Sequence, residues 1–114
     1  MESAISKQNG ATIVQAIGKL DSFSSKEFEE KLVGLIAQGS NKLVIDCAQL
    51  EYVSSAGLRV FYLASSHLEE KGGRMVFCGL NANVRRVFDI VEMSTEFRIV
   101  EAVSDALQAL KDPL

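Results

Sequence analysis

Three consecutive aliphatic residues, Leu43-Val44-Ile45, stand directly before Asp46. In a strand with one face toward water, apolar and polar residues alternate, because successive side chains point to opposite faces. An apolar run without that alternation indicates a central strand covered on both faces, as in a parallel or mixed sheet with crossover helices. This segment therefore predicts a layered α/β fold.

Strand and helix patterns alternate along the rest of the chain, without a composition break or an internal repeat. We predict strands at 11–17, 43–45, 74–78 and 97–100, with a short strand before the hairpin signal Asn9-Gly10. Helices are predicted at 24–37, at 56–71, around Val84, Val87, Phe88 and Val91, and around Val103, Ala106, Leu107 and Leu110. With 114 residues, 47% of them hydrophobic, the chain is expected to form one α/β domain, 1–114, whose mixed sheet of four to five strands packs with about four helices.

The ends of the first predicted helix carry recognisable signals. Ser24 and Glu27 fit a capping box, in which each side chain would bond the other residue's backbone N–H. Phe28, Leu32, Leu35 and Ile36 share one face of this helix, and Gly39 fits its end.

The second predicted helix has two distinct faces. At about 100° per residue, the core-facing side holds Gly57, Phe61, Ala64 and Leu68. The opposite side holds Arg59, Tyr62, Ser66 and Glu70. Leu63 lies at the margin of this polar side, which makes it a candidate apolar contact for another protein, although a lone exposed leucine is also common.

The segment from Tyr52 to Leu58 places a hydroxyl at the predicted start of that second helix. A helix N-terminus presents unpaired N–H groups and the positive end of the helix dipole. Ser55 is therefore expected to cap the helix, and it is also well placed to carry an anion. The alternative is a cap without chemistry, because serine is among the commonest N-cap residues.

Composition gives no indication of a nucleic acid or membrane partner. The formal net charge is −3, so a basic surface would need a local patch, and Arg85-Arg86 fits a solvated helix face or a contact with an acidic protein better. No apolar run approaches the roughly 20 residues of a membrane span, and the N-terminus lacks the pattern of a signal peptide. The chain is expected to be cytosolic.

Neither a metal site nor a catalytic site is predicted. Cys47 and Cys78 each end a predicted strand and are expected to be buried thiols. His67, the single histidine, would lie about 18 Å from Ser55 along one helix, too far to act as its base. Gly72-Gly73 leads from a helix to a strand, which does not fit a phosphate-binding loop. We expect no enzyme activity and no cofactor.

Several segments, in their order along the chain, match a known pattern. The central ones are Leu43-Val44-Ile45-Asp46, the segment from Tyr52 to Leu58, and Gly72-Gly73 before a hydrophobic strand. The flanking ones are Gly18-Lys19-Leu20-Asp21, similar to Gly-x-Leu/Ile-Asp, and Asn83 to Ile90, similar to Val-x-x-x-Phe. Together they resemble the bacterial anti-sigma factor antagonists of the STAS domain family.

This resemblance implies a cytoplasmic STAS domain whose unphosphorylated form binds an anti-sigma factor with serine kinase activity and thereby releases the sigma factor. Ser55 aligns with the serine that the kinase phosphorylates, and a serine phosphatase restores the active form. The implied partner-binding residues are Asp21, Ser54, Ser55, Ala56, Gly57, Arg59 and Leu63. The resemblance also implies a monomer or weak dimer, with neither direct nucleic acid binding nor membrane insertion.

Two positions leave alternatives open. The family usually has aspartate immediately before the acceptor serine, whereas this chain has Ser54, which is a second candidate acceptor. Asp21 fits either a turn residue or a contact with the partner.

The fold admits other functions as well. A STAS domain without a phosphorylation switch could serve as a scaffold, as a stressosome-like component or as a regulatory part of a transport system. A small nucleotide-binding module is a further alternative.

Overall fold

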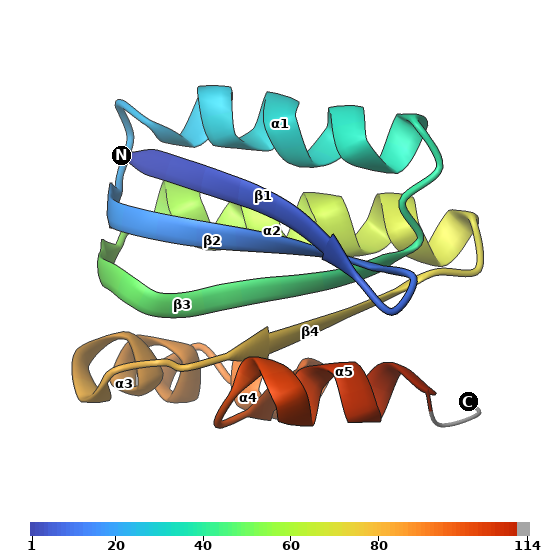
Figure 1. Ribbon diagram of the computed structural model, residues 1–114. Helices are drawn as coiled ribbons and strands as arrows, with labels where there is room; N and C mark the ends of the chain where they lie inside the picture. Colours follow the sequence, from blue (N-terminus) through green and yellow to red (C-terminus); the bar gives the residue numbers. More distant parts are fainter. Residues whose placement is uncertain (112–114) are drawn as a thin grey trace.

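The strands form a single five-stranded sheet in the order β1-β2-β3-β4-β5 (Figure 1). The computed structural model describes residues 1–111. Its elements are β1 (Glu2–Gln8), β2 (Ala11–Leu20), α1 (Ser25–Ala37), β3 (Lys42–Val53), α2 (Ser55–Glu70), β4 (Arg74–Cys78), α3 (Ala82–Ile90), α4 (Met93–Glu96), β5 (Arg98–Val100) and α5 (Val103–Lys111). The predicted α/β class and mixed sheet are confirmed; the short helix α4 was not predicted.

The sheet is mixed because its first connection is a hairpin and the others are crossovers. β1 pairs antiparallel with β2, and the turn between them has positive φ at Asn9 (54°) and Gly10 (80°), as a two-residue hairpin turn requires. The pairs β2–β3, β3–β4 and β4–β5 are parallel. The hairpin predicted at Asn9-Gly10 is confirmed.

Helices cover both faces of β3, as the apolar run predicted. Leu43 and Ile45 belong to the core beneath α1 and α2, whereas Val44 belongs to a second core beneath α5. All three side chains are 0% exposed. Figure 1 shows α1 and α2 on one side of the sheet and α5 on the other.

Phenylalanine rings join the helices to the sheet on the α1 and α2 side. The ring of Phe61 lies 4.9 Å from that of Phe77 and 6.1 Å from those of Phe28 and Phe88, measured between centroids. Two of these contacts are edge-to-face, the arrangement that aromatic quadrupoles favour. These contacts fix α2 against α1, β4 and α3.

Two predicted details differ from the structure. Tyr62, on the polar side of α2, is half-buried because its ring packs 5.3 Å from that of Phe97, whereas Arg59, Ser66 and Glu70 on the same side are exposed. β3 does not end near Cys47 but continues to Val53, since the mixed residues of its second half pair with β2 and are covered by α3. Asn81, the N-cap of α3, donates from Nδ2 to the carbonyl of Leu50 at 3.0 Å.

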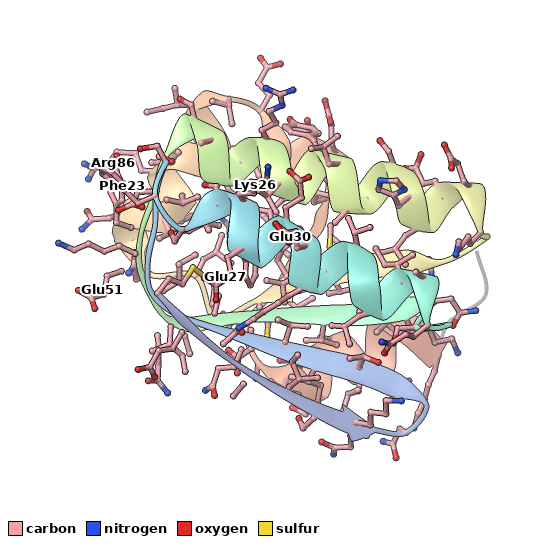
Figure 2. The ribbon with its side chains drawn as sticks, turned by 90° about the horizontal axis from the view of Figure 1, so that it is seen from above. Phe23, Lys26, Glu27, Glu30, Glu51 and Arg86 are labelled. Carbon is pink, nitrogen blue, oxygen red and sulfur yellow. The ribbon has the colours of Figure 1, made fainter. Side chains whose placement is uncertain are left out.

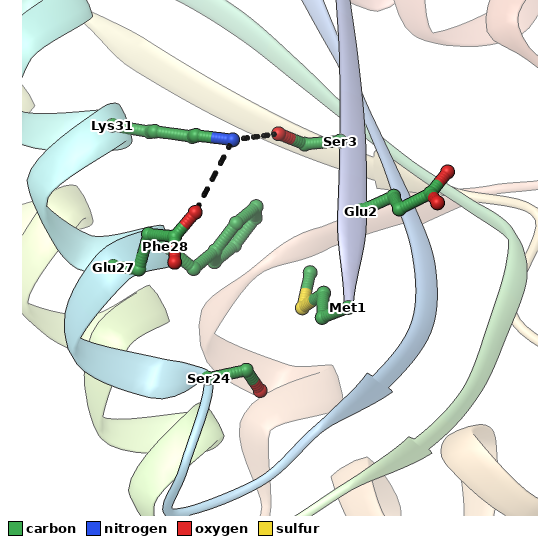
Figure 3. Close-up of a pocket in the computed structure, with 7 residues that line it drawn as sticks. All are labelled: Met1, Glu2, Ser3, Ser24, Glu27, Phe28 and Lys31. Carbon is green, nitrogen blue, oxygen red and sulfur yellow. Dashed lines mark hydrogen bonds and ion pairs between the residues drawn. The ribbon is translucent and has the colours of Figure 1, made fainter.

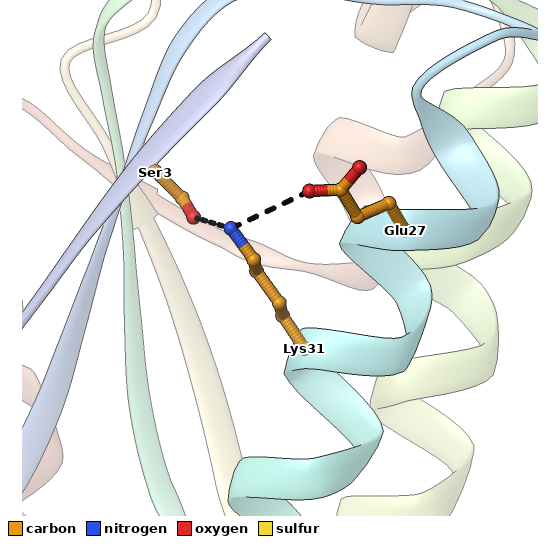
Figure 4. A network of polar contacts seen from close by, with 3 residues as sticks. All are labelled: Ser3, Glu27 and Lys31. Atoms are coloured by element: carbon orange, nitrogen blue, oxygen red, sulfur yellow. Dashed lines mark hydrogen bonds and ion pairs between the residues drawn. The ribbon is translucent and has the colours of Figure 1, made fainter.

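The predicted capping box at α1 is also wrong. Ser24 occupies the N-cap position but accepts no bond from the helix N–H groups. Glu27 instead lies 3.8 Å from Lys31, whose Nζ is 3.1 Å from Ser3 Oγ (Figure 4). This pair is solvent-exposed and ties β1 to α1 only weakly.

Gly57 permits a close approach between α2 and the sheet. A Cβ at this position would lie 2.7 Å from Leu20 Cγ and 2.9 Å from Val53 Cγ2. These two residues are the paired last residues of β2 and β3. The first turn of α2 therefore rests directly on the ends of both strands.

Gly57→Ala should lower the free energy of unfolding by about 1–3 kcal/mol, because the added methyl overpacks this contact. Gly34→Ala is the matched control, since a Cβ at Gly34 in α1 meets no atom within 4 Å, and it should raise stability by about 0.5–1 kcal/mol. Chemical denaturation measures both. Equal changes in the two variants would contradict the close approach at Gly57.

Candidate functional site

The candidate site lies where β2 and β3 end. Because these strands are parallel, their carboxyl ends meet at one edge of the sheet, the common location for binding sites in α/β folds. Leu20 pairs with Val53, and the N–H of Ser54 donates to the carbonyl of Leu20 at 2.9 Å. The turn after β2 and the start of α2 are thus held side by side.

The two adjacent serines at the start of α2 differ in hydrogen bonding and in exposure. Ser54 is the N-cap, and its Oγ accepts from the N–H of Gly57 at 3.2 Å. Ser55 is the first helical residue and is exposed. The expectation that Ser55 caps α2 is therefore wrong by one position: the cap hydroxyl is engaged and half-buried, while the next hydroxyl faces solvent.

Asp21 organises the turn between β2 and α1. Its Oδ1 accepts from the N–H of Phe23 at 2.9 Å and from the N–H of Ser24 at 3.2 Å. The bond from Phe23 is the main reason why the pKa of this carboxyl lies below its ordinary value. Asp21 is thus a turn residue; its predicted contact with a partner stays a prediction.

The remaining predicted partner-binding residues differ in accessibility. Arg59 is exposed and lies one helical turn beyond Ser55, whereas Ala56 and Leu63 are half-buried. Gly57 is buried against the sheet and offers no side chain to a partner. Around Ser55, the accessible surface therefore comes from Arg59, the half-buried residues and the Asp21 turn.

An aromatic residue missing from the predicted site stands in the same turn. The side chain of Phe23 is 95% exposed, and that of Tyr52, near the end of β3, is 50% exposed. Figure 2 shows Phe23 at the end of the molecule where α1 begins. The available signal was a single aromatic between hydroxyl residues in Asp21-Ser22-Phe23-Ser24, outside any apolar periodicity.

The cavity beside this turn is small. Ser24, Glu27 and Phe28 line one side of it and Met1 and Ser3 the other (Figure 3). Its volume of about 20 Å³ holds about one water molecule. This cavity is therefore too small to hold a small-molecule ligand.

Other reactive groups lie away from this surface. Cys47 and Cys78 are free and buried, as predicted, and burial raises the pKa of the Cys78 thiol to about 12. Within residues 1–111, no three His, Cys, Asp or Glu side chains are grouped as metal ligands would be. No helix in the same range has the length and apolar character needed to cross a membrane.

The sequence profile of the STAS domain matches residues 2–106. The chain belongs to the STAS domain family. BtrV of Bordetella bronchiseptica, a candidate anti-sigma factor antagonist by name, is 32% identical over 114 residues, which is 100% of this chain and 98% of BtrV. The resemblance to anti-sigma factor antagonists is therefore confirmed.

Solved structures agree on the fold of this STAS domain. That of TM1081 from Thermotoga maritima, also a candidate anti-sigma factor antagonist, has a TM-score of 0.92 and 17% identity, covering 96% of this chain and 95% of that one. The anti-sigma factor antagonist SpoIIAA in its unphosphorylated form has a TM-score of 0.77 and 16% identity, covering 98% of this chain and 100% of that one. Its phosphorylated form, from Bacillus, has a TM-score of 0.74, 16% identity and coverage of 95% and 98%.

Removing the two hydroxyls should have unequal effects on stability. Ser54→Ala should lower the free energy of unfolding by about 1 kcal/mol, because the N–H of Gly57 loses its cap. Ser55→Ala should change it by less than about 0.5 kcal/mol, since that side chain is exposed. Denaturant titration measures both, and a larger loss in Ser55→Ala would contradict the assignment of the cap.

Acidification should loosen the Asp21 turn. The folded-state pKa of Asp21 is lowered, so its contribution to the turn is complete above the ordinary aspartate pKa of about 3.9 and is lost as the pH falls through the lowered value. The amide of Phe23 should then lose protection from hydrogen exchange, which NMR measures. Asp21→Asn is the control, because it keeps an Oδ1 acceptor without titrating; equal pH dependence in that variant would exclude Asp21 as the cause.

Proposed function

We propose that this STAS domain is a cytoplasmic anti-sigma factor antagonist controlled by phosphorylation of Ser55. Its unphosphorylated form binds an anti-sigma factor that is also a serine kinase, and the sigma factor is released. The observation that carries this proposal is the exposed hydroxyl of Ser55, presented at the start of α2 beside the Asp21 turn. The names of BtrV and SpoIIAA support the same function.

Ser55, and not Ser54, is the acceptor in this proposal. A phosphoacceptor hydroxyl must enter a kinase active site, and that of Ser55 is accessible. The hydroxyl of Ser54 is half-buried and accepts from the N–H of Gly57. Phosphorylating Ser54 would disturb a bond on which the helix end depends.

The unusual Ser54 is compatible with this switch. Serine and aspartate are comparable N-cap residues, so Ser54 can perform the capping that the family's usual aspartate would also perform. What the chain loses is one negative charge beside the acceptor. We therefore expect the geometry of the switch to be retained and its electrostatics to differ.

The surroundings of Ser55 suit an added phosphate. Phosphate adds about −1.5 to −2 charges, which the helix N-terminus stabilises. The first turn of α2 contains no acidic side chain, and Arg59 lies four residues further along the same helix. The fold can therefore accept the modification, while an interface packed on the hydroxyl cannot, and a serine phosphatase would restore binding.

The first test is phosphorylation of the purified chain by the cognate anti-sigma factor kinase with Mg-ATP. Intact mass and peptide mapping should show one phosphate, on Ser55, with dissociation of the complex. Ser54→Ala should still be modified and Ser55→Ala should not. Phosphate on Ser54 would overturn the choice of acceptor, and stable binding without phosphate would identify a scaffold or antagonist that does not switch.

The second test measures kinase binding by titration calorimetry without ATP. Ser55→Asp should weaken binding by about two orders of magnitude, because a charge at the centre of the interface is desolvated without a partner. Ser55→Ala should bind as the wild type does. Wild-type affinity in Ser55→Asp would contradict a switch based on charge.

A further inference from the structure

Phe23 is almost fully exposed to solvent, and its ring does not contribute to the core of this chain. Phe23 is 95% exposed, whereas the other exposed large apolar residues within residues 1–111 range from 39% to 73%. A phenyl ring gains nothing from water, because removing apolar surface from water is favourable. The ring is therefore available for burial against another molecule.

The backbone beneath Phe23 is fixed. Oδ1 of Asp21 accepts from the N–H groups of Phe23 and Ser24 at 2.9 and 3.2 Å. The Oγ of Ser24 lies 3.0 Å from the carbonyl of Lys19, and the N–H of Ser25 donates to the carbonyl of Asp21 at 2.9 Å. A ring held on an ordered turn loses less conformational entropy on binding than one on a loose loop.

The turn also adjoins the proposed phosphorylation site. The N–H of Ser54 bonds to the carbonyl of Leu20, the residue before Asp21, so the turn and the start of α2 form one continuous surface. A partner that covers the hydroxyl of Ser55 is therefore adjacent to Phe23. Buried aromatic residues near the centre of an interface often contribute most of its binding energy.

The surface beside the turn does not offer a second copy of this chain a recess for the ring. In a two-fold contact each copy would have to receive the ring of the other in a recess on the same surface. The cavity beside the turn measures about 20 Å³, the space of about one water molecule, and cannot hold a phenyl ring. The turn itself therefore supplies no recess for the ring of a second copy, which favours a pocket on a different protein.

We propose that Phe23 is an aromatic anchor that inserts into an apolar pocket of the anti-sigma factor kinase, and that Asp21 positions it. This inference rests on the proposed function and adds to it a residue that determines partner affinity. Asp21 would then be a turn residue that affects partner binding indirectly, because it holds the aromatic ring of Phe23 in place.

The test compares Phe23→Ala with Ile5→Ala in binding to the purified kinase that modifies Ser55, by calorimetry without ATP. Ile5 is 47% exposed and pairs with Val14, about 20 Å along β2 from the turn. Phe23→Ala should raise Kd by about 30-fold or more with an unchanged melting temperature. Ile5→Ala should stay within about twofold.

The possible outcomes distinguish failure of the proposed role of Phe23 from failure of the proposed antagonist function. Wild-type affinity in Phe23→Ala, while Ser55→Asp still abolishes binding, would overturn the anchor and leave the proposed function intact. Slower dephosphorylation with unchanged kinase affinity would assign Phe23 to the phosphatase and overturn the kinase as its partner. Failure of the wild-type chain to bind the kinase would overturn both.

A double-mutant cycle tests whether Asp21 acts through Phe23. Asp21→Ala should weaken kinase binding in the wild-type background and have almost no effect in Phe23→Ala, because the residue that it positions is already absent. Asp21→Asn should bind nearly as the wild type does, since its Oδ1 still accepts from the turn N–H groups. Additive losses would show that Asp21 contacts the partner directly and would overturn the positioning role.

Discussion

The seating of α2 on the ends of two parallel strands is the contact on which the site depends. Leu20 and Val53 pair at the ends of β2 and β3, and Gly57 brings the helix onto both side chains. The N–H of Ser54 closes the junction by donating to Leu20. Without this close approach, the turn after β2 and the first turn of α2 would not form one surface.

The helix cap and the proposed phosphorylation site are adjacent residues at this junction. The hydroxyl of Ser54 is used by the helix cap, while that of Ser55 remains exposed. Because the cap and the proposed phosphate acceptor are different residues, the acceptor can be modified without removing a bond that the fold needs. The turn shows the same division: the carboxylate of Asp21 accepts hydrogen bonds from backbone N–H groups, and the side chain of Phe23 remains exposed.

Sequence periodicity predicted the strands and long helices well, and the errors have identifiable causes. The capping box predicted at Ser24 does not form; the N–H of Ser24 instead donates to Oδ1 of Asp21 in the turn before α1. Tyr62 was grouped with the exposed residues of α2 because periodicity does not reveal that Phe97, far along the chain, packs against its ring. The first error arises from hydrogen bonds within one turn and the second from a contact with a distant segment; in each case that interaction overrides the local pattern.

The sequence by itself determined the α/β class, the doubly covered central strand and a serine at the start of α2, because each follows from local periodicity and the chemistry of helix ends. The tertiary structure decided which serine is the cap, since that depends on where the helix begins on the sheet. It also decided that Phe23 is exposed. Periodicity predicts which face of a helix or strand is buried, but the accessibility of a residue in a turn depends on how the surrounding segments pack.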